Sequence, residues 1–481
     1  MRVLFASSEA HPLVKTGGLG DVSGSLPDAL KRLGADVRVI LPGYPQAIER
    51  AGAVTAIAEL SVGRAGAAVR ILEGRLPGSS VPVYLVDAPA YFHRAGHPYI
   101  GPDGRDWQDN HLRFGVFNET VAALAVDHTH IGWKPTIVHC NDWQSGLVPA
   151  LLRAELDRPA TIFTIHNLAY QGLFDRAALD EIGLDPALWS MNGLEFYGKL
   201  SFMKGGLAFA DRLTTVSPTY AHEIRTQQLG AGLEGLLSER ADRLTGILNG
   251  IDYRFWDPAT DPYLPAHYDR DDLTGKAANK EALQSRFALP LDPAAPLLGH
   301  IGRMVEQKGT DLLLDALPRL LRRGDVQAVI LGSGDLALED AAQRLAAAWP
   351  GRVGAYVGYD ERLAHLIEAG SDMFVMPSRF EPCGLNQMYS LRYGTPPIAR
   401  RTGGLADTVV DASSSALGAG TANGFVFAQA SPEALLEACH RALGLFSNRQ
   451  AWRSLVRQGM SQDFSWMRSA REYLELYRAI R

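Results

Sequence analysis

Short runs of aliphatic and β-branched residues alternate along this chain with longer windows in which apolar residues recur every three or four positions. Uninterrupted apolar runs are typical of parallel strands buried on both faces, and the longer windows are typical of amphipathic helices. The pattern therefore predicts an α/β protein with helices on both faces of parallel sheets. The predicted strands are Arg2–Ala6, Asp36–Leu41, Val81–Val86, Thr136–His139, Thr161–Thr164, Arg212–Val216, Leu297–Ile301, Gln327–Leu331, Val353–Val357, Met373–Pro377 and Pro397–Arg400.

The length of the chain divides these elements into two domains. A single hydrophobic core stops growing at about 250–300 residues, and this chain has 481. We expect a doubly wound, Rossmann-like domain over residues 1–245 and a second one over 246–463, with a helical segment over 464–481. Ligands of such folds bind at the carboxyl ends of the strands. The predicted helices include Trp189–Ala210 and Thr310–Arg323.

Composition excludes several classes of function. The formal net charge of −6 argues against nucleic acid or an anionic membrane as the main partner. The three cysteines have no metal-type spacing and predict no disulfide framework, which fits a reducing cytoplasm. The first apolar run is too short for a secretory signal, and no run of about 18 apolar residues occurs. We expect a cytoplasmic globular protein.

A glycine-rich segment, Lys15-Thr16-Gly17-Gly18-Leu19-Gly20-Asp21, follows the first strand. It leads into a helix that we expect to begin around Asp21. Glycines allow the backbone to approach a ligand closely, and N–H groups at a helix start favour an anion. Lys15 adds a positive charge, so Lys15, Gly17 and Gly18 are candidate phosphate ligands. The alternative is a turn with a purely structural role.

A second loop, Gly302 to Gly309, follows the strand Leu297–Ile301 and carries Arg303 and Lys308. Arginine binds phosphate oxygens as a fork and lysine binds them as a point charge, so both are candidate ligands of a diphosphate. The alternative is two solvated surface cations.

A third segment, Glu381-Pro382-Cys383-Gly384-Leu385, lies shortly after the strand Met373–Pro377. Pro382 prevents an ordinary helical entry and Gly384 permits close backbone approach. The N–H groups of Cys383, Gly384 and Leu385 beside the Glu381 carboxylate are suited to holding sugar hydroxyls. The alternative is that Glu381 caps the following helix.

Two polar groups end strands of the first half: Asp142, after Thr136–His139, and His166, after Thr161–Thr164. Both would lie at the carboxyl edge of the sheet. A lone histidine is more often structural, but this position beside Asn167 favours a functional one.

Seven motif segments follow one another along the chain: KTGGLGDV, HCNDW, IHNLAYQG, NGIDY, GRMVEQKG, SRFEPCGL and YGTPPIARRTGGLADTV. Together, and in this order, they closely resemble bacterial glycogen synthases and plant starch synthases, from the first residue to nearly the last. The resemblance implies the GT-B fold of glycosyltransferases, in which two Rossmann-like domains face a central cleft. It also implies that the last helix packs back on the first domain.

The activity implied by the resemblance is transfer of glucose from ADP-glucose to the non-reducing end of an α-1,4-glucan such as glycogen, with retention at the anomeric carbon. The resemblance implies that Lys15, Arg303 and Lys308 bind the diphosphate. It implies that Glu381 and the backbone of Cys383 to Leu385 bind glucose hydroxyls, and that His166, Asp142 and Asn249 lie around the glucose. It also implies that Tyr359 contacts the adenine. Neutralising any one of the three cations is expected to cut turnover by ~10²–10³.

Two positions depart from the commonest family pattern. Gln144 stands where many relatives have histidine, and Asn386 stands where some have threonine. Both residues are polar, so hydrogen bonds can be kept, and the departures affect side-chain detail more than function.

Aromatic residues of a glycine- and proline-containing loop, Tyr91 and Tyr99 among them, are candidate acceptor ligands, because aromatic faces stack on sugar rings; ordinary loop packing is the alternative. We expect no cofactor and no metal. Cations already neutralise the diphosphate, and Asp269-Arg270-Asp271 suits helix capping better than a metal site.

Three other functions fit the sequence less well. Another GT-B glucosyltransferase, using UDP-glucose, shares the fold but not the full motif set. A non-catalytic glucan-binding relative would have no need of Lys15, Arg303, Lys308 and Glu381. A dinucleotide oxidoreductase would rest on Gly332-Ser333-Gly334, where Ala337 occupies the third glycine position.

Overall fold

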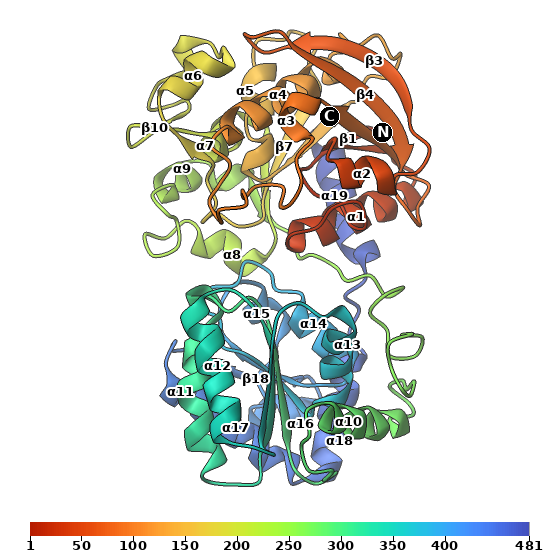
Figure 1. The fold of residues 1–481 in the computed structure, drawn as a ribbon, viewed down its shortest axis with the longest axis vertical. Coiled ribbons are helices and arrows are strands. Elements are labelled where there is room, and N and C mark those ends of the chain that lie inside the picture. The colour runs from red at the N-terminus through yellow and green to blue at the C-terminus, as the bar shows by residue number, and fades with distance from the viewer. Residues whose placement is uncertain (481) are drawn as a thin grey trace. The chain divides into compact units, whose positions relative to one another are not determined.

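The computed structural model describes residues 1–480, which divide into two compact units. Unit 1 comprises Met1–Gly250 and the chain from Trp466 onward, and unit 2 comprises Ile251–Ser465. The first and the last described segments of the chain therefore both lie in unit 1 (Figure 1). The first boundary lies at 250/251 rather than 245/246, because residues 244–246 still belong to the sheet of unit 1, where Leu244 pairs with Leu213.

Within residues 1–480, the main sheet of unit 1 has nine strands in the order β12-β11-β7-β6-β1-β2-β5-β4-β3. Strands β12 to β5 of this order run parallel, and β4 and β3 are antiparallel additions at one edge. The strands are β1 (Arg2–Ala6), β2 (Asp36–Pro42), β3 (Thr55–Val62), β4 (Ala67–Arg75), β5 (Pro82–Asp87), β6 (Ile137–Asn141), β7 (Ala160–Ile165), β11 (Arg212–Thr215) and β12 (Leu244–Gly246).

The central strands of unit 1 are those that the apolar runs predict. Val3 to Ala6 of β1 are fully buried because helices cover both faces of the sheet. The edge strands β3 and β4 were not predicted. Exposed positions interrupt the buried ones in β4, and β3 is mostly exposed or partly buried, so neither strand has an unbroken buried run.

The helical elements of unit 1 surround this sheet. They are α1 (Gly18–Arg32), α2 (Pro45–Arg50), α3 (Pro89–Phe92), α4 (Asn110–Ala125), α5 (Val148–Leu152), α6 (Ala177–Ile182), α7 (Phe202–Phe209), α8 (Pro218–Glu223), α9 (Glu234–Glu239), α19 (Trp466–Ala479) and the 3₁₀ turns η1 (Trp143–Ser145), η2 (Pro186–Leu188) and η3 (Ala241–Arg243). Helix α1 begins at Gly18, earlier than the expected start around Asp21.

The predicted helix Trp189–Ala210 is wrong over most of its length. Only α7 is helical, and the preceding residues form β9 (Glu195–Phe196) and β10 (Lys199–Ser201). In a small antiparallel sheet, β10 pairs with β9 on one side and with β8 (Leu173–Phe174) on the other. Tyr197 and Gly198 have φ of +48° and +78°, the left-handed conformation of a tight hairpin turn. Ser201 then caps α7 by accepting a hydrogen bond from Lys204 N.

Helix α19 completes unit 1. It packs against α1, and the Tyr477 hydroxyl lies 2.6 Å from His139 Nδ1 at the centre of the sheet. The Ser469 hydroxyl donates to Leu248 O at 2.6 Å. The last helix is therefore an integral part of the first unit.

Within residues 1–480, unit 2 has one six-stranded, entirely parallel sheet in the order β15-β14-β13-β16-β17-β18. Its strands are β13 (Leu297–Ile301), β14 (Gln327–Gly332), β15 (Val353–Val357), β16 (Met373–Met376), β17 (Pro397–Arg400) and β18 (Phe425–Phe427). Its helical elements are α10 (Thr274–Arg286), η4 (Glu306–Lys308), α11 (Thr310–Leu321), α12 (Leu336–Ala348), α13 (Glu361–Gly370), α14 (Asn386–Arg392), α15 (Gly403–Thr408), α16 (Ser414–Ala419), α17 (Pro432–Phe446) and α18 (Arg449–Met460).

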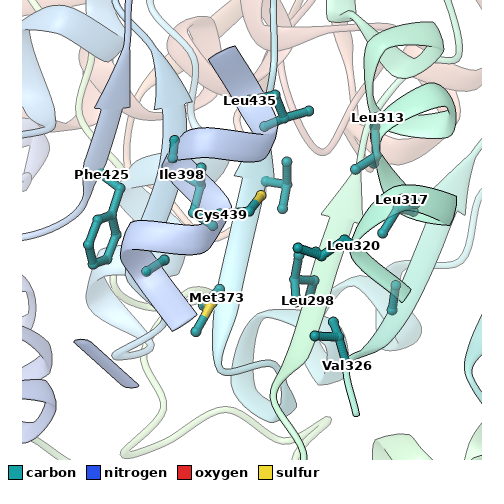
Figure 2. Close-up of a cluster of buried hydrophobic side chains, with 14 of the residues drawn as sticks. Leu298, Leu313, Leu317, Leu320, Val326, Met373, Ile398, Phe425, Leu435 and Cys439 are labelled. Carbon is teal, nitrogen blue, oxygen red and sulfur yellow. The ribbon is translucent and has the colours of Figure 1, made fainter. Parts of the chain in front are cut away.

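The two faces of this sheet bury separate clusters. Leu298 and Met373 point to one face, where they join α11 and α17, whereas Leu297 and Phe374 point to the other, where they join α10 and α13. Figure 2 shows the first cluster, with Leu313, Leu317 and Leu320 of α11 and Leu435 and Cys439 of α17 among its members. Consecutive residues of one strand thus enter different cores, which is why the strands read as unbroken apolar runs.

The proline-containing stretch after residue 256 is fixed to unit 2. Asp261 Oδ2 lies 2.6 Å from His365 Nδ1, and Trp256 stacks between His365 and Tyr389 with ring centroids 3.7 and 3.9 Å apart. The expected doubly wound α/β architecture is confirmed for both units.

Candidate functional site

The candidate residues of unit 2 lie at the carboxyl ends of two neighbouring strands. Lys308 follows β13 and Glu381 follows β16, and these strands pair directly in the sheet. Although 73 positions separate them, Lys308 Nζ donates to Glu381 Oε2 at 2.6 Å. Two residues that the sequence places in separate motifs therefore form one group.

A glycine makes this approach possible. Gly309, between η4 and α11, has φ of +67°, and a Cβ there would lie 2.1 Å from the carbonyl oxygen of Pro377. Only glycine allows the start of α11 to contact the end of the β16 segment in this way. Lys308 is thereby held beside the loop that carries Glu381.

The Glu381 carboxylate is buried, with 5% of the residue exposed. Besides Lys308, the Ser378 hydroxyl donates to Glu381 Oε2 at 3.1 Å. Helix α14 begins at Asn386 with Leu385 as its N-cap residue, and the Glu381 carboxylate bonds to Lys308 and Ser378 instead of to the start of this helix. The alternative interpretation of Glu381 as a helix cap is therefore wrong.

The backbone after Glu381 is fixed by a second glycine turn. A Cβ at Gly403 would lie 1.9 Å from Glu381 O, and one at Gly404 would lie 2.1 Å from Cys383 O. Gly404 N donates to the carbonyls of Glu381 and Pro382, both at 3.2 Å. The tight packing of two backbones holds the segment from Glu381 to Leu385 in one position beside the carboxylate.

The remaining unit 2 candidates also follow strands of the parallel sheet. Arg303 is exposed in the loop after β13, and Tyr359, after β15, is 78% exposed. Asn386 Nδ2 donates to Ile301 O at 2.9 Å, so this departure from the commonest family pattern ties α14 to the end of β13.

In unit 1, the glycine-rich loop is occupied by a carboxylate of the chain itself. Glu9, 3% exposed, accepts hydrogen bonds from Thr16 N and Thr16 Oγ1, both at 2.5 Å, and from Gly17 N at 3.2 Å. The Tyr99 hydroxyl also donates to Glu9 at 2.7 Å and lies 2.7 Å from Ser8 Oγ. Two of the loop amides expected to attract an external anion thus bind Glu9, which sequence reasoning missed.

Lys15, the cation of this loop, forms a 2.7 Å ion pair with Asp21 in the first turn of α1. Its side chain is 37% exposed. The loop therefore makes two sets of contacts with charged groups of the chain itself. Its backbone binds the buried Glu9 carboxylate, and Lys15 pairs with Asp21 at the surface.

Asp142 and His166 meet at the carboxyl ends of β6 and β7. The Asp142 carboxylate accepts a 2.7 Å hydrogen bond from His166 N, and His166 Nε2 lies 2.9 Å from Asn141 Oδ1. Asn141 Nδ2 donates to Ala6 O and His139 O, which turns its oxygen toward His166. His166 Nε2 therefore carries the ring proton, and Nδ1 is an acceptor.

Burial determines the charge of both groups. It raises the pKa of Asp142 to about 7 and lowers the pKa of His166 to about 3, so the imidazole is neutral at neutral pH. Asp142 has φ of +55° and ψ of 179°, a conformation that non-glycine residues rarely adopt. Strain of this kind is concentrated at functional sites.

Three side-chain amides of unit 1 have buried oxygens without a hydrogen-bond partner among residues 1–480. They are Gln144 Oε1, Gln171 Oε1 and Asn249 Oδ1. Asn249 is a candidate ligand from its motif, and an unsatisfied buried acceptor suits a residue that awaits a ligand donor. Gln144 lies within η1 and is 5% exposed, and its backbone oxygen accepts from Asn118 Nδ2 at 2.8 Å.

The two candidate acceptor tyrosines have different surroundings. Tyr99 contacts Glu9, as described, and its ring packs against Trp143 and Phe114. Tyr91 lines a surface pocket with Arg64 and residues of α4 and α6.

Residues 1–480 contain neither a group of metal-binding side chains nor a helix that could span a membrane. No group of three His, Cys, Asp or Glu side chains within residues 1–480 is placed to hold a metal ion. Asp269 closes a turn by accepting from Asp271 N and Asp272 N, and Asp272 accepts from Thr274 N at the start of α10. Each helix in the described residues is too short or too polar to cross a membrane.

Comparison with protein families gives two matches, one in each unit. Residues 2–239 match the starch synthase catalytic domain family, and residues 282–458 match glycosyl transferases group 1. A glycogen synthase from Thioalkalivibrio sulfidiphilus is 59% identical over 99% of both chains. Glycogen synthase 1 from Methylococcus capsulatus is 56% identical over 99% of this chain and 96% of its own.

Solved structures agree with the sequence matches. The catalytic domain of starch synthase IV from Arabidopsis thaliana, bound to ADP and acarbose, is 36% identical and has a TM-score of 0.88, covering 99% of this chain and 98% of that one. Sucrose-phosphate synthase from Thermosynechococcus elongatus is 18% identical with a TM-score of 0.59, over the same shares of the two chains, and shows similarity of fold alone.

Proposed function

Because this chain belongs to the family of bacterial glycogen and plant starch synthases, we propose that it is a glucosyltransferase that moves glucose from ADP-glucose to the non-reducing end of an α-1,4-glucan. The observation that carries the proposal is the contact between Lys308 and the buried Glu381 at the ends of adjacent strands. It places a cation for a phosphate next to a carboxylate for sugar hydroxyls, which is the combination a sugar nucleotide requires.

In this proposal, unit 2 binds the donor. The Lys308 ammonium has three N–H groups, so it can keep its bond to Glu381 while donating to the diphosphate. Arg303 adds a forked donor to the same phosphates. Glu381 and the backbone from Cys383 to Leu385 hold the glucose hydroxyls.

Further donor contacts follow from the same assignment. Exposed Tyr359 stacks on the adenine, and Lys15 contributes a charge to the diphosphate from the glycine-rich loop. Asn249, with its unsatisfied buried oxygen, binds a donor hydroxyl.

The reaction breaks the bond between the anomeric carbon and the diphosphate. Negative charge grows on the departing phosphate, and fixed cations stabilise it without reorganising. We propose retention through attack on the same face, with a departing phosphate oxygen accepting the proton of the acceptor hydroxyl. His166, neutral with a hydrogen-bond acceptor at Nδ1, and Asp142 orient the glucose rather than forming a covalent intermediate.

The proposal includes the absence of a metal requirement and a cytoplasmic location. Lysine and arginine side chains neutralise the diphosphate, a task for which other glycosyltransferases and kinases use Mg²⁺. An ADP-glucose enzyme also needs a compartment that supplies nucleotide sugars.

The test is incorporation of labelled glucose into a glycogen primer, with ADP-glucose and UDP-glucose supplied separately and in competition. We expect incorporation from ADP-glucose, with linkages cut by an α-1,4-specific amylase. Equal or preferential use of UDP-glucose would show a different GT-B glucosyltransferase. Binding of glycogen without transfer from either donor would show a non-catalytic relative.

A further inference from the structure

The loops that carry Lys308 and Glu381 are joined by a third side chain, Arg379. Its NH1 and NH2 atoms donate to the two carboxylate oxygens of Asp311, each at 2.7 Å. Asp311 lies in the first turn of α11, directly after the Lys308 loop. Arg379 lies two positions before Glu381, so a forked ion pair links the two loops.

Backbone hydrogen bonds extend this link. Arg379 NH1 donates to Glu306 O at 2.8 Å, and Arg379 N donates to Gln307 O at 2.8 Å. In return, Gln307 Nε2 donates to Phe380 O at 3.3 Å. Arg379 thus binds η4 through both its side chain and its backbone, at the two residues that precede Lys308.

The geometry of the Arg379–Asp311 ion pair indicates a stronger interaction than that of an ordinary surface ion pair. Exposed single-contact pairs contribute little because solvent screens them and two flexible side chains must be ordered. Here the bonds are two-fold and parallel, Arg379 is 28% exposed, and the same guanidinium also binds a backbone carbonyl. The Arg379 hydrogen bond accordingly lowers the pKa of Asp311, which stays ionised.

We propose that Arg379, paired with Asp311, is a positioning residue that sets the place of Lys308 relative to Glu381 and thereby orients the donor. The inference rests on the proposed function for the identity of that donor. Arg379 touches neither reacting atom in this assignment; it acts through the two loops. A displacement of about 1 Å at a reacting group can cost ~10²-fold in rate.

The first experiment compares Arg379→Gln with the wild-type chain and a matched control. Arg441 also binds both oxygens of an aspartate, Asp411, and a backbone carbonyl, Val426 O, elsewhere in unit 2. We expect Arg379→Gln to lower kcat/KM for ADP-glucose by ~10–10²-fold and to leave KM for glycogen unchanged. Arg441→Gln should leave both unchanged at a similar melting temperature. Equal losses in the two variants, or none in Arg379→Gln, would overturn the inference.

A double-mutant cycle separates the pair from its members. Asp311→Asn should lower kcat/KM less than Arg379→Gln, because the backbone bonds of Arg379 remain. The double variant should resemble Arg379→Gln alone, since the interaction is already lost. Arg379→Lys keeps the charge without the fork and should stay closer to Arg379→Gln than to the wild type. Independent, multiplying losses would contradict a shared positioning role.

One readout does not depend on the substrate. Acylation of Lys308 by acetic anhydride, followed by mass spectrometry, measures how firmly its ammonium is held. We expect a several-fold faster reaction in Arg379→Gln than in the wild type and Arg441→Gln. If the wild-type chain transfers no glucose, the proposed function fails while this measurement still decides the positioning role. Unchanged Lys308 reactivity would reject that role.

Discussion

Each unit has a candidate phosphate-binding lysine in the loop after a parallel strand, and the surroundings of the two lysines differ. In unit 2, Lys308 binds a carboxylate that is nearly excluded from water, and its loop is braced from a neighbouring strand. In unit 1, Lys15 binds the partly exposed Asp21, and the amides of its loop bind the chain's own Glu9. A sequence motif therefore identifies a cationic residue, but the residues packed around it determine how strongly its charge can interact with a phosphate.

This difference ranks the phosphate ligands. A buried charge acts through a low effective dielectric, and a surface charge is screened by water and salt. The sequence alone assigns equal losses to the three cations. The structure instead predicts that Lys308 matters more than Lys15.

The largest effect is expected from Lys308→Ala. Removal of this preorganised donor should lower kcat by ~10²–10³, measured with saturating ADP-glucose and glycogen. Lys280 is a matched control in unit 2, because it forms a buried 2.6 Å ion pair with Asp372 away from these loops. Lys280→Ala should lose stability but keep its turnover. Wild-type turnover in Lys308→Ala would remove Lys308 from the proposed diphosphate ligands.

Next in size is the pH dependence at Asp142. Burial raises its pKa in the folded state to about 7 from an ordinary value near 4, so the folded chain binds the extra proton between these values. The stability from this group is complete below pH 4 and is lost as pH rises toward 7, by at most about 1.4 kcal/mol per pH unit. Asp142→Asn should therefore gain stability relative to the wild type from pH 5 to pH 7, measured by urea unfolding at each pH. A constant difference would show that Asp142 has an ordinary pKa.

For Lys15→Ala we expect a smaller loss than for Lys308→Ala, about 10- to 100-fold in kcat/KM for ADP-glucose, because the charge is screened. The loss should shrink at high ionic strength. Lys134→Ala removes another lysine of a surface ion pair in unit 1, with Asp157, and should have no effect on activity. A loss as large as that of Lys308→Ala would erase the distinction between the units.

Glu9→Gln tests whether the glycine-rich loop depends on its internal carboxylate. The substituted amide can accept from fewer of the Thr16 and Gly17 donors, so we expect the free energy of unfolding to fall by about 2 kcal/mol. Glu119, which accepts a single backbone N–H from Gly63, provides the control, and Glu119→Gln should cost less. If Glu9→Gln instead binds ADP more tightly at unchanged stability, the carboxylate competes with the donor for the loop amides.

Removal of divalent metal is expected to have no effect on the rate of glucose transfer. Glucose transfer in excess EDTA should equal transfer with added Mg²⁺ in the wild type, since cationic side chains neutralise the diphosphate. Activity lost in EDTA and restored by Mg²⁺ would mean that the cations of the two units are insufficient.

The sequence predicts the sheets well because local pattern and burial agree there. Each strand of unit 2 except β18 is recognisable from an apolar run whose alternate residues enter two cores. The failure at Trp189–Ala210 has the opposite cause. Its apolar spacing fits a helix, but Gly198 allows a hairpin turn, and the small sheet satisfies the backbone locally.

The site divides in the same way. The motifs identify Lys308 and Glu381, and the position of each after a strand predicts the edge of the sheet at which they lie. Their direct bond depends on Gly309 meeting Pro377, a long-range contact without a local signal. Glu9 was missed because a single glutamate after a strand carries no pattern; only the folded loop reveals its donors.

The discontinuity of unit 1 has a consequence for synthesis on the ribosome. Strand β1 is made before unit 2, but its unit still lacks α19 when the whole of unit 2 has been made. Domains fold as units during synthesis, and translation adds about 5–20 residues per second. Unit 2 can therefore complete its core while the face of unit 1 that receives Tyr473 and Tyr477 is still uncovered. Unit 1 is started before unit 2 and finished after it, and translation that stalls between Ser465 and Ala479 leaves that face open to chaperones.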